Sequence, residues 1–95
     1  MISFTVRMRF AQEDRAEILD ILHELTEASR QEPGCVHYLP HWVQGEACTV
    51  LIYEHYKDQK AEEAHRQSPH FKKYAVAGLY QKMLERSRED LAALD

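Results

Sequence analysis

Glycine is scarce in this sequence, with only three among 95 residues. Loops that cradle phosphate groups, and the sharp turns that present a catalytic serine, need glycine at fixed positions. The sequence contains no such loop, no Walker sequence, no nucleophile elbow and no paired-CxxC zinc pattern. The enzyme classes that depend on these motifs are therefore excluded.

Basic residues and long apolar runs are also few. Lys and Arg number 12 against 16 Asp and Glu, which gives a formal net charge of −4 and leaves no basic stripe for a nucleic acid backbone. The apolar runs fall far short of the roughly 20 residues that span a bilayer. The first ten residues alternate like a strand and do not form a signal-peptide core. We expect a cytoplasmic protein that binds neither nucleic acid nor membrane.

Only two cysteines occur, Cys35 and Cys48. Residues 34–44 and 47–56 are rich in strand-forming residues around a tight turn, and a hairpin there would pair Cys35 with Tyr56. The two cysteines would then lie about 25 Å apart at roughly 3.3 Å per residue. A disulfide needs Cα atoms within about 7 Å, so both thiols are predicted to be free, which fits a reducing compartment.

The length fits a single domain, residues 1–95. Apolar and polar side chains alternate over residues 2–10, which predicts a strand with one buried face. Residues 14–32 carry apolar side chains at helical spacing and begin with Asp14 and Glu17, the spacing of a capping box. A Pro-Gly pair ends this predicted helix.

The second half of the chain is predicted to be largely helical. Asp58 is the expected N-cap of a short helix that ends near Arg66, and serine followed by proline at 68–69 restarts a helix. Residues 85–95 are poor in strand formers, so the sequence leaves open whether this tail pairs with the sheet or is helical. The order of elements predicts an α+β fold of the ferredoxin-like split β-α-β type.

Residues 49–53 are apolar on both faces of their predicted strand. Helices on one side of a sheet leave its other face in water, and a chain this short gains from extra burial. A second copy is the simplest cover. We therefore expect a homodimer whose sheets enclose an apolar pocket.

Six histidines are present, and two of them, His37 and His41, share one face of a predicted strand. They would lie about 13 Å apart, too far to bind one metal ion together. No metal site is predicted. The hairpin register places His37 opposite Glu54, which we interpret as a structural pair in preference to a catalytic dyad.

His65 and His70 flank the break between the two predicted helices. They could form the polar end of an apolar pocket, with His65 as a proton donor or acceptor, since imidazole titrates near neutrality. They could equally cap helix ends. Core packing explains most of the aromatic residues, and one or two are expected to line a pocket.

Three segments, EPGCVHY at 32–38, YEHYKD at 53–58 and AHRQSPHF at 64–71, resemble the antibiotic biosynthesis monooxygenase family, particularly its quinol monooxygenase-like members. The likeness covers roughly residues 2–80, and AHRQSPHF is its most specific part. The resemblance implies a ferredoxin-like fold and a homodimer that forms a dimeric α/β barrel. It also implies oxidation of a small aromatic quinol or phenol by dioxygen, without flavin, haem, metal or any other cofactor.

The resemblance implies roles for individual residues. His65 is the first candidate for the catalytic base, and Glu54 is its partner or an alternative base. The expected substrate-binding residues are Tyr38, Trp42, His70, Phe71 and Tyr74. The sequence contains no asparagine, whereas haem-degrading relatives use asparagine with tryptophan, so haem degradation is disfavoured.

Two other functions stay open. An isomerase of a small phosphorylated metabolite would need a phosphate site, for which Arg7 and Arg9, on the polar face of the first strand, are the only arginines suitably placed. A non-catalytic stress-response module would only bind a small apolar ligand. The sequence does not separate these functions, because one fold hosts several chemistries.

Overall fold

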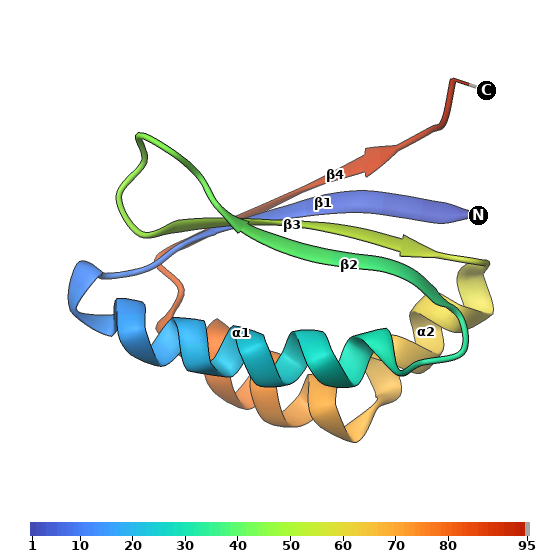
Figure 1. The fold of residues 1–95 in the computed structure, drawn as a ribbon, viewed down its shortest axis with the longest axis horizontal. Coiled ribbons are helices and arrows are strands. Elements are labelled where there is room, and N and C mark those ends of the chain that lie inside the picture. The colour runs from blue at the N-terminus through green and yellow to red at the C-terminus, as the bar shows by residue number, and fades with distance from the viewer. Residues whose placement is uncertain (95) are drawn as a thin grey trace.

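The computed structural model describes residues 1–94 and shows one sheet with helices on one of its faces (Figure 1). The elements in chain order are β1 (Ile2–Arg9), η1 (Gln12–Asp14), α1 (Arg15–Arg30), β2 (Cys35–Trp42), β3 (Thr49–Tyr56), α2 (Gln59–Gln67), the π-helix η2 (Phe71–Leu79), α3 (Tyr80–Lys82) and β4 (Glu85–Leu91). The strand order is β2-β3-β1-β4, and each neighbouring pair is antiparallel. This arrangement confirms the ferredoxin-like α+β prediction.

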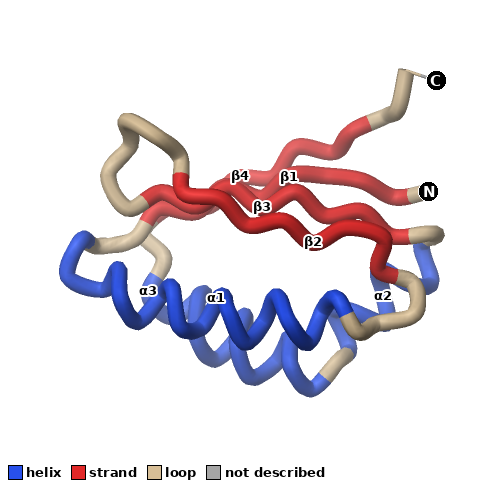
Figure 2. The backbone as a smooth tube through the Cα atoms, in the orientation of Figure 1, coloured by secondary structure: helices blue, strands red, loops and turns tan. Residues whose placement is uncertain are grey.

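The core lies between the sheet and the helices, in the two layers that Figure 2 separates by colour. Alternation along β1 turns Phe4, Val6 and Met8 toward the helices, where all three are buried. Ile18 and Leu25 of α1 are buried against this layer. The apolar faces that the helical and strand periodicities predict therefore pack against each other in one core.

Helix α1 begins one residue later than predicted and ends at Arg30. Asp14 precedes it, but its side chain makes no capping hydrogen bond within the described residues, so the capping-box prediction is wrong. Asp14 and Glu17 instead face Lys82, whose Nζ lies 3.7 Å and 3.3 Å from their carboxylate oxygens. Because the helix stops at Arg30, Glu32 lies in the turn that leads to β2.

The β2–β3 hairpin contains a bulge that sequence pairing does not anticipate. Cys35 pairs with Tyr56 as predicted, but the register then shifts, so that His37 lies opposite His55 and Tyr38 opposite Glu54. The predicted His37–Glu54 pair is therefore wrong, because one extra residue on β2 moves every later partner by one position. The prediction that both cysteines are free is confirmed.

Serine and aspartate side chains organise the helices after β3. Asp58 Oδ1 accepts a hydrogen bond from the Ala61 amide at 2.8 Å, which confirms the predicted N-cap of α2. Ser68 Oγ donates to the His65 carbonyl at 2.6 Å and accepts from the Phe71 amide at 3.2 Å. Ser68 thus joins the end of α2 to the start of the next helix.

The tail forms the fourth strand, which answers the question that the sequence left open. Residues Glu85–Leu91 pair with β1 along its length, although every one of their side chains is exposed. Charged side chains are typical of an edge strand, since they discourage pairing with other sheets. Arg9 and Glu85 add a cross-strand ion pair at 2.7 Å.

The second face of the sheet is not covered by any helix in the described part of the chain. Leu39, Leu51 and Tyr53 form its apolar portion, whereas β1 contributes Ser3, Thr5 and arginines. This face is thus apolar only in part. Within residues 1–94, we find no helix with the length and apolar character needed to cross a membrane.

Candidate functional site

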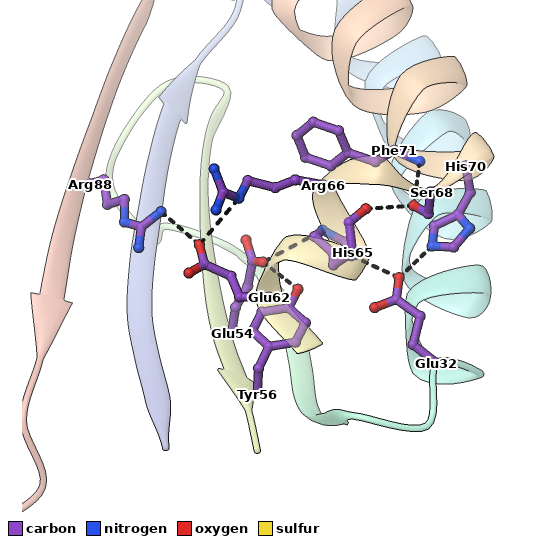
Figure 3. Close-up of polar contacts among 10 residues, drawn as sticks. All are labelled: Glu32, Glu54, Tyr56, Glu62, His65, Arg66, Ser68, His70, Phe71 and Arg88. Carbon is purple, nitrogen blue, oxygen red and sulfur yellow. Dashed lines mark hydrogen bonds and ion pairs between the residues drawn. The ribbon is translucent and has the colours of Figure 1, made fainter. Parts of the chain in front are cut away.

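A small pocket of about 50 Å³ lies between the sheet and the junction of α2 with η2. Its floor is apolar, with Phe4, Val6 and Ile52 from the sheet. Its polar groups come from separate elements: Glu54 from β3, His65 from α2 and Arg88 from β4 (Figure 3). The pocket therefore combines a dry interior with a few converging polar side chains, as ligand sites commonly do.

His65 is the most enclosed polar group of this pocket and is only 2% exposed. Its Nδ1 lies 2.8 Å from Glu32 Oε2, and its Nε2 lies 3.8 Å from Glu54 Oε1 (Figure 3). An ionised carboxylate only accepts hydrogen bonds, so the contact with Glu32 places the imidazole proton on Nδ1. Nε2 then presents a lone pair toward Glu54, as a proton acceptor would.

Glu32 links the two histidines that flank the helix break. The same Oε2 atom that contacts His65 lies 2.5 Å from His70 Nε2. Its Oε1 is buried and has no hydrogen-bond partner among the described residues. Sequence reasoning did not predict a site role for Glu32, although it lies directly before the Pro-Gly turn and opens the family-like segment EPGCVHY.

Glu54 is a buried carboxyl group that accepts a hydrogen bond from the Tyr56 hydroxyl at 2.7 Å. Burial raises the pKa of Glu54, and the Tyr56 hydrogen bond, His65 when it is protonated, and the Arg88 charge oppose this effect only in part. Burial and the Glu54 carboxylate also raise the pKa of Tyr56. Tyr56 therefore acts as a hydrogen-bond donor, and the protonated form of Glu54 is favoured more than in water.

Aromatic rings surround the imidazole of His65. Its ring centroid lies 5.2 Å from that of Tyr56, 5.2 Å from Phe71 and 5.7 Å from Tyr38. These rings keep water from the imidazole, so its Nε2 lone pair meets Glu54 in otherwise apolar surroundings.

Cationic side chains stand at the mouth of the pocket. The Arg88 guanidinium lies 3.7 Å above the Phe4 ring and 3.2 Å from Glu62 Oε2, which Arg66 also approaches at 3.7 Å. The prediction that only Arg7 and Arg9 could bind a phosphate was incomplete, because it did not anticipate β4.

Arg7 and Arg9 themselves lie on the other face of the sheet from His65. They face carboxylates there: Arg7 lies 3.9 Å from Glu46, and Arg9 lies 2.7 Å from Glu85. A phosphate held by these arginines would be separated from the histidines by the sheet.

The structure brings most of the predicted site residues together. Glu54, His65, Tyr38 and Phe71 line the pocket, and His70 joins it through Glu32.

Trp42 lies elsewhere, in a larger groove of about 450 Å³ between α1 and β2. There the Arg15 guanidinium stacks 4.0 Å from the centroid of its ring. Tyr74 lines neither cavity and contacts Lys73, whose Nζ is 5.1 Å from its ring centroid.

Solved structures share this fold over most or all of their length. The chain superposes on an antibiotic biosynthesis monooxygenase with a TM-score of 0.92 and 21% identity, covering 100% of both chains. It matches Rv0793 from Mycobacterium tuberculosis with a TM-score of 0.88 and 23% identity, covering 99% of this chain and 95% of that one. It matches PA3566 from Pseudomonas aeruginosa with a TM-score of 0.89 and 21% identity, covering 99% of this chain and 94% of that one.

At this level of identity the structural likeness establishes the fold alone. The sequence matched none of the curated proteins with which it was compared. The family model described as antibiotic biosynthesis monooxygenase, however, matches residues 1–77 of the 95. The chain therefore belongs to the antibiotic biosynthesis monooxygenase family.

Proposed function

We propose that this protein is a monooxygenase that oxidises a small aromatic quinol or phenol with dioxygen, with no cofactor taking part in the reaction. One observation carries the proposal: a buried imidazole, oriented by a carboxylate at Nδ1, points its Nε2 into an aromatic pocket. Family membership supports the same reaction class.

The chemistry requires little more than a base and a dry site. His65 Nε2 removes a proton from a substrate hydroxyl, and the resulting phenolate gives electrons to dioxygen far more readily than the neutral phenol. For a benzenediol, one oxygen atom enters the ring and the other leaves as water, which yields a hydroxyquinone. The substrate supplies all the electrons, so the protein provides proton transfer, orientation and exclusion of water.

The residues around His65 fit distinct parts of this reaction. Glu32 holds the imidazole in the tautomer whose Nε2 is free. Tyr38 and Phe71 provide flat surfaces on which an aromatic ring can pack. Glu54 lies beside Nε2, and because burial raises its pKa the neutral acid, which can donate a hydrogen bond to a substrate oxygen, is more accessible than in water.

The pocket must widen to admit an aromatic ring. Its volume of about 50 Å³ is smaller than the cavity of about 150 Å³ that binds benzene in a protein core. The mouth is the part that can move, because Arg66 and Arg88 are partly exposed and are held there by Glu62. We infer that substrate enters by displacing these ion pairs.

The proposal includes a homodimer formed through the uncovered face of the sheet. Leu39, Leu51 and Tyr53 lie there without cover from helices in the described region. A second copy packed on this face would shield them and stabilise the sheet above the pocket.

The two alternative functions differ in what they require. The isomerase needs a phosphate site, and Arg7 and Arg9 face carboxylates across the sheet from His65. The arginines at the mouth of the pocket, Arg66 and Arg88, are held by Glu62, so a phosphate there would have to displace that carboxylate. The binding module needs only the pocket and predicts no reaction.

Oxygen consumption by the purified protein with a panel of quinols and phenols tests the proposal. We expect His65→Ala, with its fold verified by circular dichroism, to lower the rate about 100-fold or more, the usual contribution of a general base. His23→Ala, on the exposed surface of α1, should leave the rate unchanged within about twofold. Ligand binding without histidine-dependent oxygen uptake would refute the enzyme and favour the binding module.

A further inference from the structure

Three metal-ligating side chains converge next to the pocket (Figure 3). They are Glu32 from the turn before β2, His65 from α2 and His70 from the start of the following helix. One ligand atom from each, Glu32 Oε2, His65 Nδ1 and His70 Nε2, lies within 4.8 Å of the other two. The sequence predicted no metal site, because only His37 and His41 were weighed as a pair of ligands; Glu32 is more than thirty positions from both histidines of this cluster.

We propose that Glu32, His65 and His70 bind a divalent transition-metal ion such as Zn²⁺, and that the bound ion removes His65 from its role as a base. The metal site itself stands on geometry alone. The effect on activity rests on the proposed function.

The ligand set is one that Zn²⁺ uses. Two imidazoles and one carboxylate provide three ligands of a tetrahedral site and leave the fourth position to water. The present separations, 2.8 Å and 2.5 Å from Glu32 Oε2 to the two nitrogens, are those of hydrogen bonds. Ligands at about 2.0 Å from an ion lie roughly 3.3 Å apart. The carboxylate would therefore move back by under about 1 Å, and the two nitrogens, now within 4.8 Å of each other, would adjust to the same separation.

Two further features of Glu32 and His70 suit a metal ion. Glu32 Oε1 is buried with no hydrogen-bond partner in the described region, which leaves a second oxygen for the ion. The side chains of His70 and Glu32 are 20% and 15% exposed, against 3% for His65. An ion can therefore reach the site from the His70 side, and a metal site needs such a path.

The environment of His65 supplies the outer contact that metal-bound histidines usually make. A histidine that binds metal through one nitrogen commonly donates its other N–H to a carboxylate or carbonyl. His65 Nε2 lies 3.8 Å from Glu54 Oε1, so a small rotation of either group would form this bond.

Metal binding and base catalysis exclude each other at His65. Without metal, Nδ1 carries the proton donated to Glu32, and Nε2 has the free lone pair. With metal, Nδ1 gives its lone pair to the ion, and the proton resides on Nε2. The imidazole then faces the pocket as a donor, so the ion is an inhibitor of the proposed reaction.

Isothermal titration calorimetry of the chelator-treated protein with Zn²⁺ tests the site. The visible absorption spectrum of the Co²⁺-loaded protein reports the coordination geometry. We expect one ion per chain and the intense visible bands of tetrahedral Co²⁺. Glu32→Gln and His70→Ala should each weaken binding by more than the roughly 10–100-fold that losing an outer-shell partner costs. His23→Ala, the exposed control on α1, should bind as the wild type does.

His70→Ala and Glu32→Gln are preferred to His65→Ala, because His65 is buried and its loss can unfold the chain. The metal site would be overturned if the wild type did not bind Zn²⁺. It would also be overturned if Glu32→Gln and His70→Ala both bound Zn²⁺ as tightly as the wild type does. Nitrogen-15 NMR of His65 gives a further readout, since the proton should move from Nδ1 to Nε2 when Zn²⁺ is added.

Activity separates the two proposals. If quinol oxidation occurs, Zn²⁺ should abolish it in the wild type and should affect His70→Ala far less. If Zn²⁺ binds at this site and no substrate is oxidised, the metal site stands and the monooxygenase fails. If oxidation occurs without any site-specific binding of Zn²⁺, the monooxygenase stands and the metal site fails.

Discussion

Glu54 is a carboxyl group placed where its charge is disfavoured. Burial raises its pKa, and neither the Tyr56 hydroxyl nor the charge of His65 fully compensates. A pKa that is higher in the folded state means that folding favours the protonated form. Ionisation of Glu54 therefore lowers the free energy of unfolding as the pH rises above the pKa of this carboxyl group in the unfolded chain, about 4.3.

Glu54→Gln tests this linkage, because glutamine can still accept the Tyr56 hydrogen bond but does not titrate. The free energy of unfolding of the wild type minus that of the variant should be largest near about pH 4. It should fall as pH rises toward the folded pKa and then level off. Urea unfolding from acid to neutral pH measures it, with Glu24→Gln on the exposed face of α1 as control. A difference that grows with pH would show that folding lowers the pKa of Glu54 and would contradict a dominant effect of burial.

Prediction from sequence at this scale succeeds where neighbours along the chain decide the outcome. His65 and His70 adjoin a visible helix break, so their convergence could be predicted. Glu32 could not be identified, because its partners are brought to it by the packing of α2 on the turn before β2. The His37–Glu54 error came from a bulge, which period-two counting does not detect.

At the scale of elements, the contact between α2 and the Pro-Gly turn positions the site. Gly34 is buried there, and a Cβ added to it would lie 2.3 Å from Ala61 Cβ and 3.4 Å from Ala61 Cα. The Gly34 carbonyl also accepts a hydrogen bond from the Lys57 amide at 2.9 Å. This close approach holds the Glu32 turn against the helix that carries His65.

Gly34→Ala should lower the free energy of unfolding by about 1–3 kcal/mol, the usual cost of overpacking a close contact. The Ala61 backbone cannot yield without shifting α2, so the Glu32–His65 contact should weaken as well. Urea unfolding measures the stability. Gly78→Ala is the matched control, since its Cβ would make an ordinary contact at 3.4 Å with Ile21. Equal stability of Gly34→Ala and wild type would contradict the close packing described here.

Most elements could be predicted from periodicity and capping, and the exceptions have physical causes. Strand β4 forms by backbone pairing along β1 and all of its residues are exposed, so its sequence carries no apolar signal. The helix at Phe71–Leu79 was predicted, but not its π-helical turn. Apolar residues four apart, such as Phe71, Ala75 and Leu79, fit either a 3.6-residue or a wider period.

At the scale of the whole molecule, the two faces of the sheet have different surroundings. The helices bury Val6, Ile52 and their neighbours on one face. On the other, Leu51 and Tyr53 are partly exposed, and Leu39 is 37% exposed. Exposed apolar side chains grouped on one face of a small domain commonly mark a subunit interface.

Leu51→Glu places a charge in the middle of this face and should convert the proposed dimer to a monomer. The variant should still fold, because Leu51 is partly exposed and lies opposite Arg7 in the register, where a carboxylate is accommodated. Val76→Glu makes the same kind of change on the π-helix, at a site 43% exposed, and should remain dimeric. Light scattering coupled to gel filtration gives the masses. A monomeric wild type would refute the dimer, and loss of the dimer in Val76→Glu alone would move the interface to the helical side.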